Sequence, residues 1–294
     1  MKLPMLFYKE TIPQKQVKSD NGVGYYCWEV LFLICFSELL CGIIMDVIEW
    51  LFSIDINGDY ETLFLLFGTI ITIILFFTIE NKNHQRSYES LGLNKNSFFK
   101  HYILGIVIGW VMISIVLLMT YVCGVASFMG IECEDPLLIV LFFVAFMIQG
   151  FEEELLCRGF MMYGISRVKS SCYGIMMNSL FFAILHLGND GLTLVAFINL
   201  LLCGIGFSLI ASYFDNIWVS SGAHSMWNFA QGNLYRILVS GIAVGPSVFR
   251  FRLQGSSFLA GGLFGLEGSI ATTIVELAVI IIFCVIYQYK KRIE

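Results

Sequence analysis

Eight apolar runs dominate the sequence, and most of them are long enough to cross a lipid bilayer as helices. A bilayer-spanning helix needs roughly 20 mostly apolar residues. The expected spans are Trp28–Phe52, Thr62–Ile79, Tyr102–Phe128, Pro136–Cys157, Cys172–Leu187, Leu192–Tyr213, Ile217–Leu234 and Ser269–Tyr287. The fifth and seventh runs are short and partly polar. The pattern predicts an all-α fold, a polytopic transmembrane helix bundle of about eight spans.

The composition excludes the other broad classes of protein. Only 13% of the 294 residues are charged, whereas 58% are hydrophobic. A soluble chain is about a quarter charged, so too few charges are present here to cover a water-facing surface. The 27 phenylalanines and 4 prolines are the opposite of a disordered composition. A net charge of -5 without basic runs argues against nucleic acid as a partner.

The basic residues predict how the bundle lies in the membrane. With eight spans, all but three of the 17 lysines and arginines fall on the side of the two termini. The three exceptions are Arg236, Arg250 and Arg252. The positive-inside rule therefore places both termini in the cytoplasm of a multi-pass protein of the cell membrane. The acidic loops Asp55–Glu61 and Glu132–Asp135 would then face outward.

Three adjacent glutamates, Glu152, Glu153 and Glu154, close the fourth apolar run. An ionisable group in the hydrocarbon region costs at least ~2.5–3.5 kcal/mol, so it indicates a functional site by default. Glu154 and Arg158 are four residues apart, which favours an ion pair on one helix face. The alternative is a plain helix end, where the acids reach water and Arg158 snorkels to the interface.

Two histidines lie in other apolar runs and favour the functional interpretation. His186 follows Phe182 by four residues, and His224 precedes Asn228 by four. Residues four apart share a helix face, so His224 and Asn228 present their polar groups to the same space. Desolvated polar groups within a helix bundle need partners, and these side chains and the glutamates can supply one another.

Water activation is the chemistry that this set of residues favours. A glutamate beside a neutral histidine takes a proton from a bound water, and a protonated histidine or an asparagine amide stabilises an oxyanion. Two histidines and a glutamate are also the ligand types of a hydrolytic zinc site. The sequence leaves both open, although the H-E-x-x-H motif is absent.

Three motifs in order resemble those of a known family. They are Glu153-Glu154-x-x-x-Arg158, Phe182-x-x-x-His186 and His224-x-x-x-Asn228, with Arg158-Gly159-Phe160 and the glycine-rich stretch Gly261–Gly268 as further similar features. They resemble the CPBP family of intramembrane endopeptidases, which comprises the type II CAAX prenyl proteases and the bacteriocin-processing, Abi-like proteins. The resemblance covers about Pro136 to Ser269.

The resemblance implies a membrane protease and a role for each motif residue. Glu153 would be the general base, and His186 would hold the same water. Arg158 would hold Glu154, while His224 and Asn228 would form the oxyanion hole. We favour a metal-free mechanism; a divalent metal such as zinc, if used, would be bound by Glu153, His186 and His224. Glu152 has no role in the motif and is expected at the helix exterior or a cavity wall.

The expected organisation follows from the motifs and the spans. It comprises a cytoplasmic segment 1–27, transmembrane helices 28–128, a catalytic membrane core 136–269, and a last helix with a basic tail, 270–294. The partners would be membrane lipid and a peptide or protein substrate, prenylated or otherwise lipophilic.

Two alternatives to a protease remain. One is an ion-coupled transporter, suggested by the further membrane acids Glu38 and Glu276 and by the glycine-rich stretch. The other is a non-proteolytic membrane scaffold or bacteriocin-immunity protein. For Glu38 and Glu276 themselves, a hydrogen bond within the bundle is the expectation. Asp46 and Glu49 are expected near the outer interface with Trp50.

Overall fold

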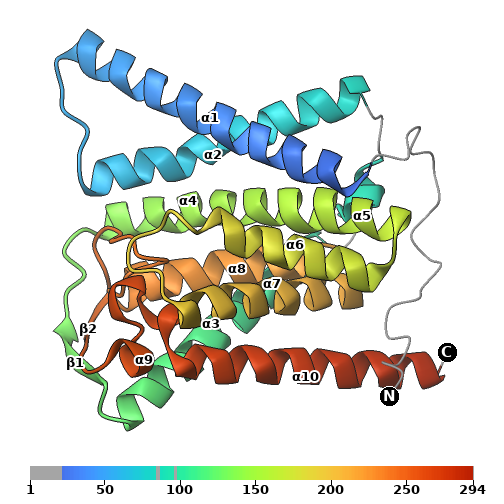
Figure 1. Ribbon diagram of the computed structural model, residues 1–294. Coiled ribbons are helices and arrows are strands. Elements are labelled where there is room, and N and C mark those ends of the chain that lie inside the picture. The colour runs from blue at the N-terminus through green and yellow to red at the C-terminus, as the bar shows by residue number, and fades with distance from the viewer. Residues whose placement is uncertain (1–21, 84–86, 96–97, 294) are drawn as a thin grey trace.

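A bundle of roughly parallel and antiparallel helices forms the protein in the computed structural model, which describes residues 22–83, 87–95 and 98–293. Helices α1 and α2 cross over α4, while α6, α7, α8 and α3 pack beneath and α10 runs along the opposite side (Figure 1). The predicted N-terminal segment 1–27 lies mostly outside the described residues, which begin just before α1.

The helices alternate in direction through the bundle. Their bounds are α1 Val23–Phe52, α2 Asp59–Asn83, α3 Phe98–Val122, α4 Pro136–Glu154, α5 Tyr163–Val168, α6 Ser171–Leu185, α7 Leu194–Phe214, α8 Trp218–Phe229, α9 Ser257–Ala260 and α10 Ile270–Ile293. Two π-helical segments, Leu155–Met162 and Ala230–Leu234, continue α4 and α8. Short 3₁₀ turns occur at Tyr88–Leu91, Gly262–Phe264 and Leu266–Gly268.

Six of the described helices are long and apolar enough to cross a membrane. They are α1, α2, α3, the continuous α4–α5 segment, α7 and α10. The other two expected spans correspond to α6, of 15 residues, and α8, of 12 residues. The polytopic helical class is therefore confirmed, whereas the count of eight stays a prediction.

Helix α8 is short and polar because the protein surrounds it. Every residue from Val219 to Phe229 is buried, and the helix packs against α3, α4 and α7. The polar side chains of α8 therefore face other helices instead of lipid. Neighbouring helices can supply hydrogen-bond partners, which the hydrocarbon of the bilayer cannot. This position makes α8 the centre of the bundle and explains why its hydropathy is low.

The third expected span was wrong at its end. Helix α3 stops at Val122 instead of Phe128, and Gly124 follows it with a φ of 71°, a conformation that glycine adopts without strain. Phe128 belongs to strand β1 (Ala126–Ile131), which pairs antiparallel with β2 (Phe249–Leu253). An apolar run alone does not distinguish a helix end from a short strand.

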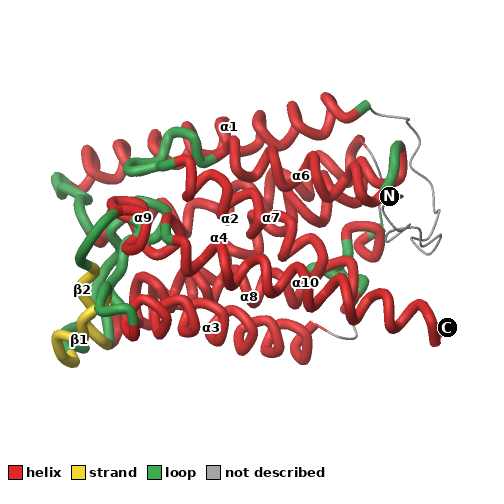
Figure 2. The backbone as a smooth tube through the Cα atoms, turned by 60° about the horizontal axis from the view of Figure 1, so that its bottom comes forward, coloured by secondary structure: helices red, strands yellow, loops and turns green. Residues whose placement is uncertain are grey.

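The strands and most loops gather at one end of the bundle, whereas α1 begins and α10 ends at the other (Figure 2). At the strand end, Glu132 accepts hydrogen bonds from Arg236 and, at 3.0 Å, from Arg250. Two of the three basic residues predicted to lie on the side opposite the termini thus share one carboxylate.

Helix α4 approaches α8 closely at Gly150. A Cβ atom at this position would stand 2.8 Å from the backbone nitrogen of Ser225, closer than real side chains allow. Small residues at a helix crossing let the two backbones approach and pack. Gly150 lies within one turn of Glu153 and Glu154, so this contact sets how near the glutamates come to α8.

Candidate functional site

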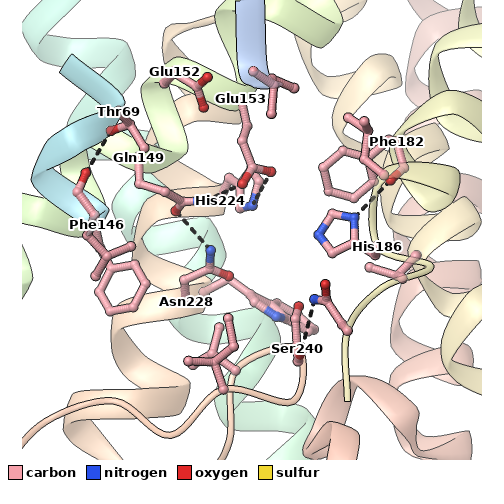
Figure 3. Close-up of a pocket in the computed structure, with 18 of the residues that line it drawn as sticks. Thr69, Phe146, Gln149, Glu152, Glu153, Phe182, His186, His224, Asn228 and Ser240 are labelled. Carbon is pink, nitrogen blue, oxygen red and sulfur yellow. Dashed lines mark hydrogen bonds and ion pairs between the residues drawn. The ribbon is translucent and has the colours of Figure 1, made fainter. Parts of the chain in front are cut away.

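A cavity of about 580 Å³ lies inside the bundle, bordered by α1, α2, α4, α6, α7, α8 and α10. Glu153, His186, His224 and Asn228 all line it, and Figure 3 shows their side chains around one space. The size falls within the range of ~300–1,000 Å³ typical of ligand sites. Its floor is formed by loop residues at the strand end, such as Asn189 and Ser240.

Glu154 forms the buried anchor of the site. Its Oε1 accepts a hydrogen bond from Arg158 Nη1 at 2.7 Å and lies 3.1 Å from His224 Nδ1. Both Glu154 and Arg158 are fully buried. Charge-assisted hydrogen bonds of this kind are strong and directional. The pair therefore holds the His224 ring so that its other nitrogen, Nε2, points toward the cavity.

Arg158 is held by aromatic rings as well as by Glu154. Its guanidinium lies 4.8 Å from the centre of the Phe182 ring and 5.6 Å from that of Phe207. Its Nη2 donates to the Gly204 carbonyl oxygen at 3.3 Å. A cation over an aromatic face is attracted by the ring quadrupole. These contacts tie the acid–base pair to both α6 and α7.

Glu153 lies in a different environment from its neighbour Glu154. Its side chain is 25% exposed, whereas that of Glu154 is 0% exposed. Its Oε2 lies 3.7 Å from His224 Nε2, and its Oε1 accepts a hydrogen bond from Gln149. Gln149 Oε1 in turn accepts from Asn228 Nδ2 at 3.1 Å. Glu153 is thus the glutamate of the pair that reaches the cavity.

His186 faces Glu153 and His224 from the other side of the cavity (Figure 3). It caps the C-terminus of α6, and its Nδ1 donates to the Phe182 carbonyl oxygen at 2.8 Å. With the proton on Nδ1, the neutral ring presents Nε2 to the cavity as a hydrogen-bond acceptor. His186 is therefore placed to hold a small polar molecule lying between it and Glu153.

The structure brings five of the six predicted motif residues into one connected network. These are Glu153, Glu154, Arg158, His224 and Asn228. His186 lines the same cavity across the gap. The predicted use of Asn228 as an oxyanion donor depends on the second hydrogen of its amide, because the first is directed to Gln149.

Sequence reasoning missed two members of the site. Gln149 bridges Glu153 and Asn228, and Glu267 binds α8 by accepting from Trp227 Nε1 at 2.9 Å. Gln149 lies four residues before Glu153 in an apolar run, and that spacing is a usable signal. Glu267 is far along the chain in the glycine-rich stretch, and no local spacing connects it with Trp227.

The remaining membrane acids lie at several places. Glu152 is buried and lines the cavity, in agreement with the predicted cavity wall. Glu38 and Glu276 also border the cavity. The side chain of Glu49 accepts from the Ile56 backbone nitrogen at 2.7 Å, just after the end of α1. The expected hydrogen bond of Glu276 is absent, since neither of its oxygens has a partner among the described residues.

The predicted metal ligands are not gathered into a set. Within the described part of the chain, no group of three His, Cys, Asp or Glu side chains is arranged to hold a metal ion. Glu153 and His224 are neighbours, but His186 stands apart from both across the cavity.

The comparisons with known proteins point to one family. Residues 135–230 match the model of the type II CAAX prenyl endopeptidase, Rce1-like family. The matched segment begins at the N-cap of α4 and ends just after α8, so it contains all six predicted motif residues. It leaves out α1, α2, α3 and α10. No curated protein matches the chain.

Proposed function

We propose, from the match of residues 135–230 to the model of the type II CAAX prenyl endopeptidase, Rce1-like family, that this protein is an intramembrane endopeptidase. Its substrate would be a membrane-associated peptide, prenylated or otherwise lipophilic. The observation that carries the proposal is the position of Glu153. It reaches a cavity inside a transmembrane bundle and lies 3.7 Å from a histidine that a buried ion pair holds in place.

In the first step of the proposed reaction, Glu153 acts as the general base. Glu153 accepts a proton from a water molecule that also donates to His186 Nε2. The water oxygen attacks the carbonyl carbon of the scissile peptide bond. Gln149 donates to the other oxygen of Glu153, so the carboxylate is oriented before the substrate arrives. A positioned general base of this kind contributes typically 10²–10⁴-fold to the rate.

In the second step, His224 and Asn228 stabilise the tetrahedral intermediate. In its protonated form, His224 donates from Nδ1 to Glu154 and from Nε2 to the oxyanion. Asn228 supplies a further N–H from its amide. Such donors are effective because they are aimed before the charge develops. Collapse of the intermediate passes the proton from Glu153 to the leaving amine and yields a carboxylic acid and an amine.

The apolar lining of the cavity favours a lipophilic substrate. Apolar side chains from five helices line much of it, among them Ile34, Leu65, Phe146, Phe182 and Leu200. A segment entering from the bilayer would keep its apolar side chains out of water while its peptide bond reaches Glu153. With both termini cytoplasmic, as the basic residues indicate, the loops bordering the cavity would face the opposite side of the membrane.

The experiment compares variants of the purified protein in lipid nanodiscs. A fluorogenic apolar peptide, with and without a C-terminal prenyl group, is the substrate. We expect Glu153→Gln to lower kcat by about 10²–10⁴-fold, because the base is lost. We expect His186→Ala to lower it by about 10²-fold. Both variants should keep the thermal unfolding transition of the wild type.

The matched control is Glu80→Gln. Glu80 is also a buried glutamate in a membrane helix, but it does not line the cavity. Its kcat should equal that of the wild type. Equal cleavage by the wild type and Glu153→Gln would reject the proposal. Absence of any cleavage by the folded wild type, across peptides with and without a prenyl group, would favour the non-proteolytic scaffold.

A further inference from the structure

The wall of the cavity is acidic to a degree that the proposed reaction does not require. Five glutamates border it: Glu38, Glu152, Glu153, Glu267 and Glu276. Within the described residues, no lysine or arginine lines it. The reaction uses only Glu153, and the buried Glu154 already has its own cation in Arg158. The wall of the cavity therefore holds more carboxyl groups than the proposed reaction uses.

Glu276 is the most exceptional of these groups. It lies on α10 and is fully buried, yet neither carboxylate oxygen has a hydrogen-bond partner among the described residues. Glu267 is the opposite case. Its Oε1 accepts from Trp227, and its Oε2 accepts from the backbone nitrogen and hydroxyl of Ser240 at 2.7 and 2.8 Å. Buried carboxylates without partners are rare, because burial removes water and nothing replaces it.

The opposite helix leaves room for this carboxylate. A Cβ atom on Gly206 of α7 would lie 3.0 Å from Glu276 Oε2, so a larger residue at this position would crowd it. Cys203 and Leu200 precede Gly206 at intervals of three residues and line the cavity. Residues at this spacing share a helix face. An apolar stripe on α7 thus leads along the cavity toward Glu276.

We propose that the substrate of this cavity carries a basic side chain, and that Glu276 binds its ammonium or guanidinium group. This inference rests on the proposed endopeptidase function. The stem of a lysine or arginine is apolar and packs on Leu200 and Cys203, while its head supplies several N–H donors to the carboxylate. An inorganic cation fits less well, because no three ligand side chains are gathered in the described residues.

The test measures binding, so that it does not depend on turnover. Glu153→Gln protein in nanodiscs is titrated with fluorescent peptides of about 20 apolar residues. One lysine is moved through successive positions of the peptide, and each peptide has a counterpart with norleucine. At one lysine position we expect a Kd at least tenfold lower than that of the norleucine peptide, which corresponds to ~1.4 kcal/mol.

The decisive variant is Glu276→Gln in the same Glu153→Gln background. It should remove the preference for lysine and leave the Kd of the norleucine peptide unchanged. Glu80→Gln is the matched control and should retain the preference. If Glu276→Gln fails to fold, the comparison of the lysine and norleucine peptides still tests the proposal, because it changes only the peptide.

Three results would overturn the proposal. One is the lack of any lysine position that improves binding. Another is a lysine preference that survives in Glu276→Gln. The third is stabilisation of the protein by Na⁺ against choline, lost in Glu276→Gln and without a lysine preference, which would mark an inorganic cation site.

A cleavage assay on the wild type separates this failure from that of the proposed function. Cleavage without a lysine preference leaves the endopeptidase intact and removes the basic substrate. A lysine preference in binding without any cleavage removes the endopeptidase and leaves a cavity that binds basic peptides.

Discussion

Replacing Arg158 by methionine tests the buried ion pair that anchors His224. The substitution keeps most of the side-chain volume and removes the charge. Glu154 and Arg158 are both 0% exposed, and their Oε1 and Nη1 atoms lie 2.7 Å apart, so Arg158→Met leaves a buried carboxylate without its cation, although His224 still contacts it. Breaking a buried pair from one side costs about 3–5 kcal/mol. Loss of the contact with the Phe182 ring adds about 0.5–2 kcal/mol.

The double variant Arg158→Met/Glu154→Gln tests whether the cost comes from the uncompensated buried charge. Glu154→Gln alone leaves a buried guanidinium and should cost about 3 kcal/mol or more. With both charges removed, no uncompensated ion remains, and the loss should be about 2 kcal/mol or less. The double variant should therefore be at least ~3 kcal/mol more stable than the sum of the two single effects.

In the two single variants and the double variant, the rate of cleavage and the free energy of unfolding should respond differently. Each free energy of unfolding is measured by titrating detergent micelles with SDS and following circular dichroism. Cleavage should stay at the level of the single variants, because in the double variant His224 still lacks its carboxylate. Additive losses of stability would refute the reasoning, as would recovery of cleavage in the double variant.

Three further changes test the packing around the site. Gly150→Ala should destabilise the bundle by about 1–3 kcal/mol, since its Cβ would meet the Ser225 backbone; an unchanged thermal midpoint would contradict this close approach. Trp227→Phe should cost about 1–3 kcal/mol through the lost donor to Glu267, and a neutral result in SDS titration would argue against that hydrogen bond. Glu132→Gln should cost about 1 kcal/mol or less, and hydrogen exchange should become faster in the two-stranded β1–β2 sheet alone.

Much of the site was predictable because its parts follow local rules. The spacing of four residues puts Glu154 beside Arg158 on one helix face, and the ion pair is present at 2.7 Å. The same spacing puts His224 and Asn228 on the wall of one cavity. The different environments of Glu153 and Glu154 were not visible locally, because they depend on how far α4 is rotated against α8.

The amino-acid pattern alone predicted the membrane class, the chain order of the helices and the six motif residues. Hydropathy and helical spacing are properties of neighbouring residues, and they survive folding unchanged. The burial of the short helix α8, the bridge of Gln149 to Asn228 and the bond of Glu267 to Trp227 came only from the packed bundle. So did the position of Glu276, whose carboxylate has no hydrogen-bond partner among the residues that the structure describes and which lies against Gly206, 70 residues earlier in the chain. Such contacts arise from the rotation and crossing of helices, which no single segment encodes.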